Sequence, residues 1–306
     1  MSKRAYYYLS YLAISAIYVI SSLLAPLGPN RFNLTASKTH LLQLTILLPV
    51  VLIWFAAVYG VEKFHTYTSS IKSYKDGKPL HLFATGLLIL VGSIIFNSIV
   101  GILRPWALAD GWLSAYTILA NYLSAWLPLL AYACMYIGSA QLLKSIKTKP
   151  KIKNPLGWLP ILLLLIIVGA IYVAVLLNYH YRSSTPDPTR YSSFYISDPL
   201  ILLTLALPYL IGWGLALKAA LNLYAYLKQV RGVIYRSAFV RLLSGVLVVT
   251  LFYIIVQMLV AFSTYIAKAG LGSILLILYM LIMLYALGFL IIASGAKKLV
   301  AIEKVT

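Results

Sequence analysis

The sequence predicts an all-α membrane protein, a bundle of about eight transmembrane helices arranged as two tandem four-helix repeats in parallel orientation. Three observations lead to this prediction. Hydrophobic residues make up 62% of the chain and charged residues 10%, whereas soluble domains are about a quarter charged. Apolar stretches long enough to cross a bilayer recur along the chain, and lysines and arginines gather on alternate connections between them. These features argue against a soluble globular fold.

Each predicted span has roughly the length that a helix needs to cross a hydrocarbon core about 30 Å thick, which is about 20 residues. The stretches are continuously apolar, whereas barrel strands alternate apolar and polar residues, so helices are expected. The first span follows a short basic start but has no small-residue cleavage site, and we interpret it as a retained span. The eight spans lie near Ala5 to Pro26, Leu41 to Val61, His81 to Leu103, Trp112 to Leu143, Leu156 to Leu177, Leu200 to Leu227, Ala238 to Ala267 and Leu271 to Ala296.

The positions of lysine and arginine predict the orientation of these spans. Of the 25 basic residues, 18 fall on the connections and termini of one side, and six on the other side. Because cytoplasmic loops carry the excess of lysine and arginine, the richer side is expected in the cytoplasm, with both termini there. The remaining basic residue, Lys218, lies within a span near its inner end, where we expect its long side chain to snorkel to the interface.

An internal duplication is predicted from matches at one offset. Sliding the sequence by 159 residues aligns two copies of L-T-x-x-L-P-x-x-x-x-W without a gap, and includes proline, tryptophan, tyrosine and glycine. The fourth span of each half matches at a nearby offset, where Ala140, Leu143 and Ile146 align with Ala296, Leu299 and Ile302. The matches at offset 159 pair Leu44, Thr45, Leu48, Pro49, Trp54, Ala57, Tyr67, Gly86 and Leu88 with Leu203, Thr204, Leu207, Pro208, Trp213, Ala216, Tyr226, Gly245 and Leu247.

The duplication divides the chain into residues 1–150 and 151–306, with four predicted spans in each part. An even number of spans gives both parts the same orientation, so an axis along the membrane normal would relate them. Pro49 and Pro208 lie inside equivalent spans, where a proline can kink a helix and form a hinge, or simply fit the local packing.

Residues that usually perform chemistry inside membranes are scarce. All six acidic residues and all four histidines are placed at span ends, in loops or in the tail. No metal-ligand spacing, phosphate-binding glycine loop or nucleophile elbow occurs. We therefore expect a protein that is not an enzyme, with no catalytic residues, no metal and no cofactor.

A cluster of uncharged polar residues is the best candidate for a ligand site. Depth along the spans places the amides of Gln43, Asn97, Asn121 and Gln257 toward the outer side. Such amides usually bond to a neighbouring helix, which contributes about 0.6 to 2 kcal/mol. The alternative is a shallow pocket open to the outside, in which Tyr116 and Tyr253 line the walls.

The formal charge of +19 is spread over short connections and forms no basic domain, so nucleic acid is not expected as a partner. The segment from Lys144 to Pro155 carries five lysines and no acidic residue. It is interpreted as a topology determinant that contacts anionic lipid at the cytoplasmic face. These lysines are Lys144, Lys147, Lys149, Lys151 and Lys153.

Three functional hypotheses follow. The leading one is a non-enzymatic sensor, scaffold or membrane-complex subunit that associates with a protein partner or with further copies of itself. The second is a transporter, or a protein that handles lipid or another small molecule, with an outward-facing polar pocket at the repeat interface. The third is an enzyme acting on lipid or isoprenoid, which the absence of an evident general base disfavours.

Overall fold

The computed structural model describes residues 3–24, 36–70, 74–109, 113–145, 199–229, 233–261 and 271–303, together with residues 163 and 166. All residues in these ranges are α-helical. The side chains described within them are mainly those of residues 5–21, 47–69, 78–100, 122–144, 207–226, 237–249 and 279–302.

Long helices account for every described range and confirm the prediction of an all-α chain. Four segments are long and apolar enough to cross a membrane: Leu47–Ser69, Lys78–Val100, Tyr122–Lys144 and Tyr279–Ile302. The predicted span from Leu156 to Leu177 lies outside the described residues apart from two positions, so the count of eight stays a prediction. The helices are α1 (Lys3–Leu24), α2 (Ala36–Ser70), α3 (Tyr74–Ala109), α4 (Leu113–Ser145), α6 (Pro199–Gln229), α7 (Val233–Ala261) and α9 (Leu271–Glu303).

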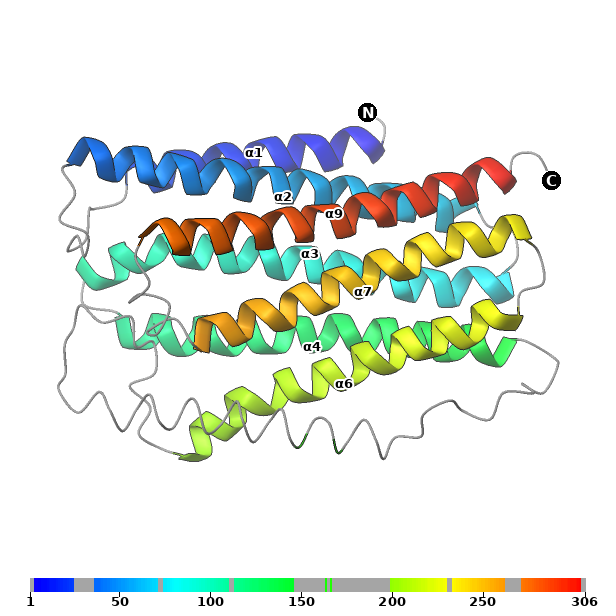
Figure 1. Ribbon diagram of the computed structural model, residues 1–306. Helices are drawn as coiled ribbons and strands as arrows, with labels where there is room; N and C mark the ends of the chain where they lie inside the picture. The colour runs from blue at the N-terminus through cyan, green and yellow to red at the C-terminus, as the bar shows by residue number, and fades with distance from the viewer. Residues whose placement is uncertain are drawn as a thin grey trace.

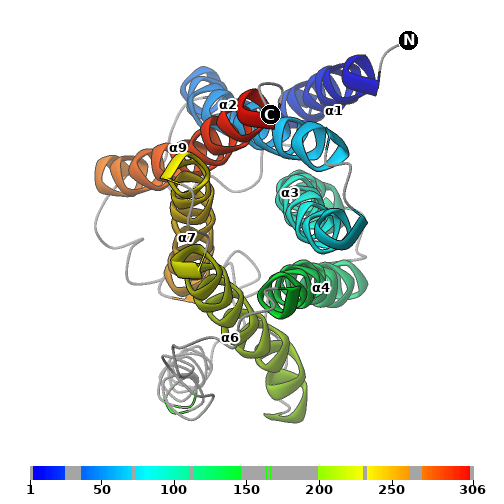
Figure 2. The ribbon, with the colours of Figure 1, turned by 90° about the vertical axis from the view of Figure 1, so that its right-hand side faces the viewer.

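Six of these helices form a closed ring. Figure 1 shows them side by side, and the view along the bundle in Figure 2 shows α2, α3, α4, α6, α7 and α9 following one another around a centre. Each packs against the next, and α9 closes the ring by packing against α2. Helix α1 lies outside the ring against α2 and α3. The start of α1 and the end of α9 lie at the same end of the bundle (Figure 1).

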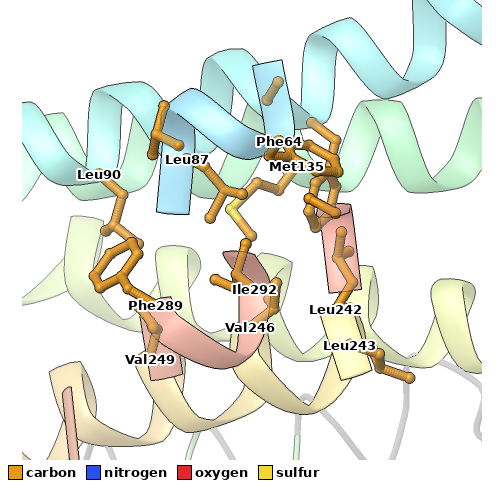
Figure 3. Close-up of a cluster of buried hydrophobic side chains, with 14 of the residues drawn as sticks. Phe64, Leu87, Leu90, Met135, Leu242, Leu243, Val246, Val249, Phe289 and Ile292 are labelled. Atoms are coloured by element: carbon orange, nitrogen blue, oxygen red, sulfur yellow. The ribbon is translucent and has the colours of Figure 1, made fainter. Parts of the chain in front are cut away.

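Side chains from all six helices fill the centre of the ring with one hydrophobic cluster. Figure 3 shows part of it, in which side chains from α2, α3 and α4 meet those from α7 and α9. Outside the ring, Trp54 of α2 packs on Tyr18 of α1, with ring centroids 4.6 Å apart. Large side chains with almost no exposure in the central cluster are Phe64, Phe83, Leu87, Leu90, Tyr132, Met135, Leu142, Leu242 and Phe289.

Prolines inside the helices do not interrupt them. Pro49 lies within α2, Pro208 within α6, and Pro128 within α4, and each helix continues on both sides. The first two are the prolines that the predicted duplication pairs. Whether Pro49 and Pro208 form a hinge or fit the local packing stays a prediction.

Glycines allow the closest helix contacts in the ring. A Cβ added to Gly86 of α3 would lie 2.6 Å from the Ala131 carbonyl oxygen of α4, and one added to Gly138 would lie 2.6 Å from the Pro79 carbonyl oxygen of α3. Helices α7 and α9 pack in the same manner. A Cβ on Gly245 of α7 would lie 2.6 Å from the Gly288 carbonyl oxygen of α9, and one on Gly295 would lie 2.8 Å from the Ala238 carbonyl oxygen of α7. Both interfaces therefore exclude any side chain at these positions.

We predict that Gly86→Ala destabilises the protein by about 1–3 kcal/mol, because the methyl group meets a backbone oxygen that cannot move without shifting α4. Gly92→Ala is the matched control on the same helix, since no atom lies within 4 Å of its added Cβ. The measurement is thermal unfolding of both variants in a mild detergent. Equal unfolding temperatures for the two variants would contradict the close packing of α3 on α4.

Candidate functional site

The predicted outer amide cluster is only partly described. Asn97 of α3 is half-buried, and its Oδ1 accepts a short hydrogen bond from Ser124 Oγ of α4. This is the interhelical bond expected of a structural amide. The other candidates lie on helices whose side chains at those positions are outside the described set: Gln43 on α2, Tyr116 and Asn121 on α4, Tyr253 and Gln257 on α7. Whether they line one pocket stays a prediction.

A buried polar pair joins α4 to α6. The Nδ2 of Asn222 donates a hydrogen bond to Ser139 Oγ at 3.3 Å, and Ser139 Oγ donates to the carbonyl oxygen of Tyr136 at 2.8 Å. Ser139 and Asn222 are both buried, so the bonds are formed away from lipid and water. Sequence reasoning missed this pair because the two residues lie 83 positions apart on different helices, and no pattern along one helix links them.

Lys218 lies one helical turn before Asn222, and its environment corrects an expectation. We expected its side chain to snorkel toward the membrane interface, but Lys218 is 7% exposed and lies within the bundle. Neighbouring helices cover almost all of the Lys218 side chain. The expectation counted depth along a single helix and could not include these neighbours.

Glu62 is a second buried charge that the sequence placed at the end of a span. Helix α2 continues to Ser70, and Glu62 is 5% exposed. Its Oε2 lies 2.7 Å from Lys63 Nζ, and its Oε1 accepts a hydrogen bond from Thr66 Oγ1 at 3.3 Å. The ion pair and the hydroxyl compensate for the burial of the carboxylate.

An open cavity of about 450 Å³ lies at the periphery of the ring. It lies between α2, α7 and α9, toward the end of the bundle where α9 terminates (Figure 1). Its lining includes three cations and no carboxylate. The lining residues are Tyr59 of α2, Arg241 of α7, and Leu290, Ala293, Ser294, Lys297 and Lys298 of α9.

Each cation of this cavity has a described partner that fixes its position. Arg241 donates from its guanidinium to Ser294 Oγ at 3.1 Å, and Lys298 Nζ donates to Ser237 Oγ at 2.6 Å. Lys297 Nζ lies 5.1 Å from the centroid of the Tyr59 ring, a cation–π distance. The pattern S-x-x-K-K on α9 is visible in the sequence, but the arrival of Arg241 from α7 is a tertiary contact.

The lysine-rich segment after α4 is described only at its start. Lys144 lies in the last turn of α4 and is exposed. Lys147, Lys149, Lys151 and Lys153 are outside the described residues. Their contact with anionic lipid stays a prediction.

The described residues include no group of three or more histidine, cysteine, aspartate or glutamate side chains that could hold a metal ion. Cys134 of α4 is half-buried and not in a disulfide. Comparisons of the chain with protein-family models, with curated proteins and with solved structures gave no match.

We predict that Ser139 and Asn222 stabilise the α4–α6 interface together, with a coupling energy of about 0.6 to 2 kcal/mol. The test is a double-mutant cycle of Ser139→Ala and Asn222→Ala, read by unfolding in detergent. The control cycle pairs Asn222→Ala with Ser15→Ala, because Ser15 lies on α1, which packs on α2 and α3. A coupling equal to that of the control would show that the hydrogen bond contributes nothing.

Proposed function

We propose that the chain is a non-enzymatic multi-pass membrane protein that acts as a scaffold or as a subunit of a membrane complex. The observation that carries this proposal is the ring of continuous helices closed around an interior filled with apolar side chains. Such a centre is close-packed and rigid, and it gives the protein a fixed outer shape for lateral contacts.

The same observation disfavours the transport alternative. Secondary transporters place their substrate sites near the middle of the membrane, where discontinuous helices expose backbone groups. In the described part of this chain, the six ring helices run without interruption for 29 to 36 residues. Asn97, the one outer amide whose side chain is described, is engaged with Ser124 rather than directed at an open pocket.

The proposal includes the internal duplication, and the glycine contacts support it. Gly86 and Gly245 are 159 residues apart, and they occupy matching places at the α3–α4 and α7–α9 interfaces. Gly138 and Gly295 also match, at an offset of 157. The sequence alignment of the fourth spans has an offset that is one residue smaller. That alignment rests on matches of alanine, leucine and isoleucine. The glycine contacts are therefore the better guide to equivalence.

We predict that a cysteine placed at the centre of the ring does not react with a membrane-impermeant thiol reagent. The variant is Val246→Cys in a Cys134→Ala background, since Val246 is buried in the central cluster. Lys78→Cys in the same background is the accessible control, because Lys78 is exposed. The measurement is labelling of the protein in open membranes, so that the reagent reaches both faces.

If Lys78→Cys is labelled and Val246→Cys is not, the result supports a sealed interior and the scaffold role. Comparable labelling of both would mean that water reaches the centre of the ring and would overturn the proposal in favour of transport. Solute movement by the purified protein in liposomes would overturn it as well.

A further inference from the structure

Three cations and no carboxylate line the cavity between α2, α7 and α9. The site is shallow and open to the surroundings, and its volume of about 450 Å³ lies within the range of small-molecule sites, about 300 to 1,000 Å³. Ser294, Ser237 and Tyr59 hold the three cations in place through neutral groups, which leaves the positive charge of the cavity uncompensated by its own lining. A bound anion would supply the missing negative charge.

The donor set suits a phosphate. A guanidinium offers five N–H donors in a planar fork that matches phosphate oxygens, and one of them bonds to Ser294. Two ammonium groups add point charges from one helical turn of α9. Phosphate oxygens accept charge-assisted hydrogen bonds from both kinds of group.

An exposed apolar face leads away from the cavity along α9. Leu290 lines the cavity and is 47% exposed, and Leu287, Met283 and Met280 follow at 49%, 73% and 61%. Their spacing of three and four residues places them on the face of α9 that carries Ser294 and Lys297. An apolar path joined to a phosphate site fits an acyl chain joined to a headgroup, whereas a free phosphate would leave this path unused.

The expected orientation agrees with such an occupant. Lys63, Arg241, Lys297 and Lys298 belong to the basic side of the chain, which the positive-inside rule places in the cytoplasm. The cytoplasmic leaflet is the one that holds anionic lipids. The cavity would then lie at headgroup depth, and the apolar face of α9 would extend into the hydrocarbon.

We propose that the cavity lined by Arg241, Ser294, Lys297 and Lys298 binds the phosphate of an anionic glycerophospholipid, whose acyl chain lies along Leu290, Leu287 and Met283. This site is separate from the lysine-rich segment after α4. It does not depend on whether the protein is a scaffold or a transporter.

The test uses the purified full chain in a neutral detergent, with lipid retention recorded by native mass spectrometry. Dioleoyl phosphatidylglycerol is titrated, and dioleoyl phosphatidylcholine is the comparison, because its choline cation opposes the charge of the cavity. We expect one phosphatidylglycerol to bind at least tenfold more tightly than phosphatidylcholine. The double variant Arg241→Gln/Lys297→Gln should weaken phosphatidylglycerol binding about 30-fold, because the loss of each charge lowers the affinity about fivefold.

Lys75→Gln/Lys78→Gln is the matched control, since it removes two cations from the start of α3 on the same expected side of the membrane. Arg241→Lys/Lys297→Arg should retain binding. Circular dichroism of each variant confirms that it is folded. A further variant, Leu290→Gln, keeps every charge and should weaken phosphatidylglycerol binding, because it loses the contact with the acyl chain.

Loss of binding in Arg241→Gln/Lys297→Gln with retention in Lys75→Gln/Lys78→Gln supports the site. Equal effects of the two double variants, or no effect of either, would overturn it, because the attraction would then be a general surface charge or absent. Displacement of phosphatidylglycerol by an equal concentration of inorganic phosphate, with no effect of Leu290→Gln, would assign the cavity to a soluble phosphate and overturn the lipid assignment.

Discussion

Helices in a bilayer gain little hydrophobic free energy by leaving lipid for one another, because lipid tails are as apolar as leucine. Close contact between backbones has to hold them together. In this protein the contact depends on glycines: Gly86 and Gly138 between α3 and α4, Gly245 and Gly295 between α7 and α9, and Gly60 of α2 against the Phe289 carbonyl oxygen of α9. The close approach brings α3 to α4, and α9 to both α7 and α2, near enough for Phe64, Leu87 and Phe289 to join one buried cluster.

Polar groups in the ring serve this packing. Asn97 bonds to Ser124 between α3 and α4, and Asn222 bonds to Ser139 between α4 and α6. Each bond satisfies groups that would be costly to bury alone, and each fixes the register of two neighbouring helices. The described interior thus combines dispersion contacts with two interhelical polar pairs.

The proposed duplication has a chemical consequence at the helix interfaces. At the offset of 159, Tyr59 and Lys63 of α2 correspond to Lys218 and Asn222 of α6. On α6, Lys218 and Asn222 are both buried, and Asn222 donates a hydrogen bond to Ser139. In the first, Tyr59 borders an open cavity that gathers Arg241, Lys297 and Lys298. Two copies of one design would therefore have diverged, one toward a sealed interface and one toward an anion site at the periphery.

The sequence by itself determined the class of this protein. Apolar stretches of membrane length left the backbone no alternative to helices, and each described helix contains all or most of a predicted span, although several extend beyond it. Tertiary structure decided which side chains meet. Lys218 and Glu62 were placed near span ends by counting along single helices, yet both are buried, because neighbouring helices cover them. The cationic cavity was invisible in the sequence for the same reason: Arg241 reaches Ser294 only because α7 packs on α9, and periodicity along one helix contains no information about its neighbour.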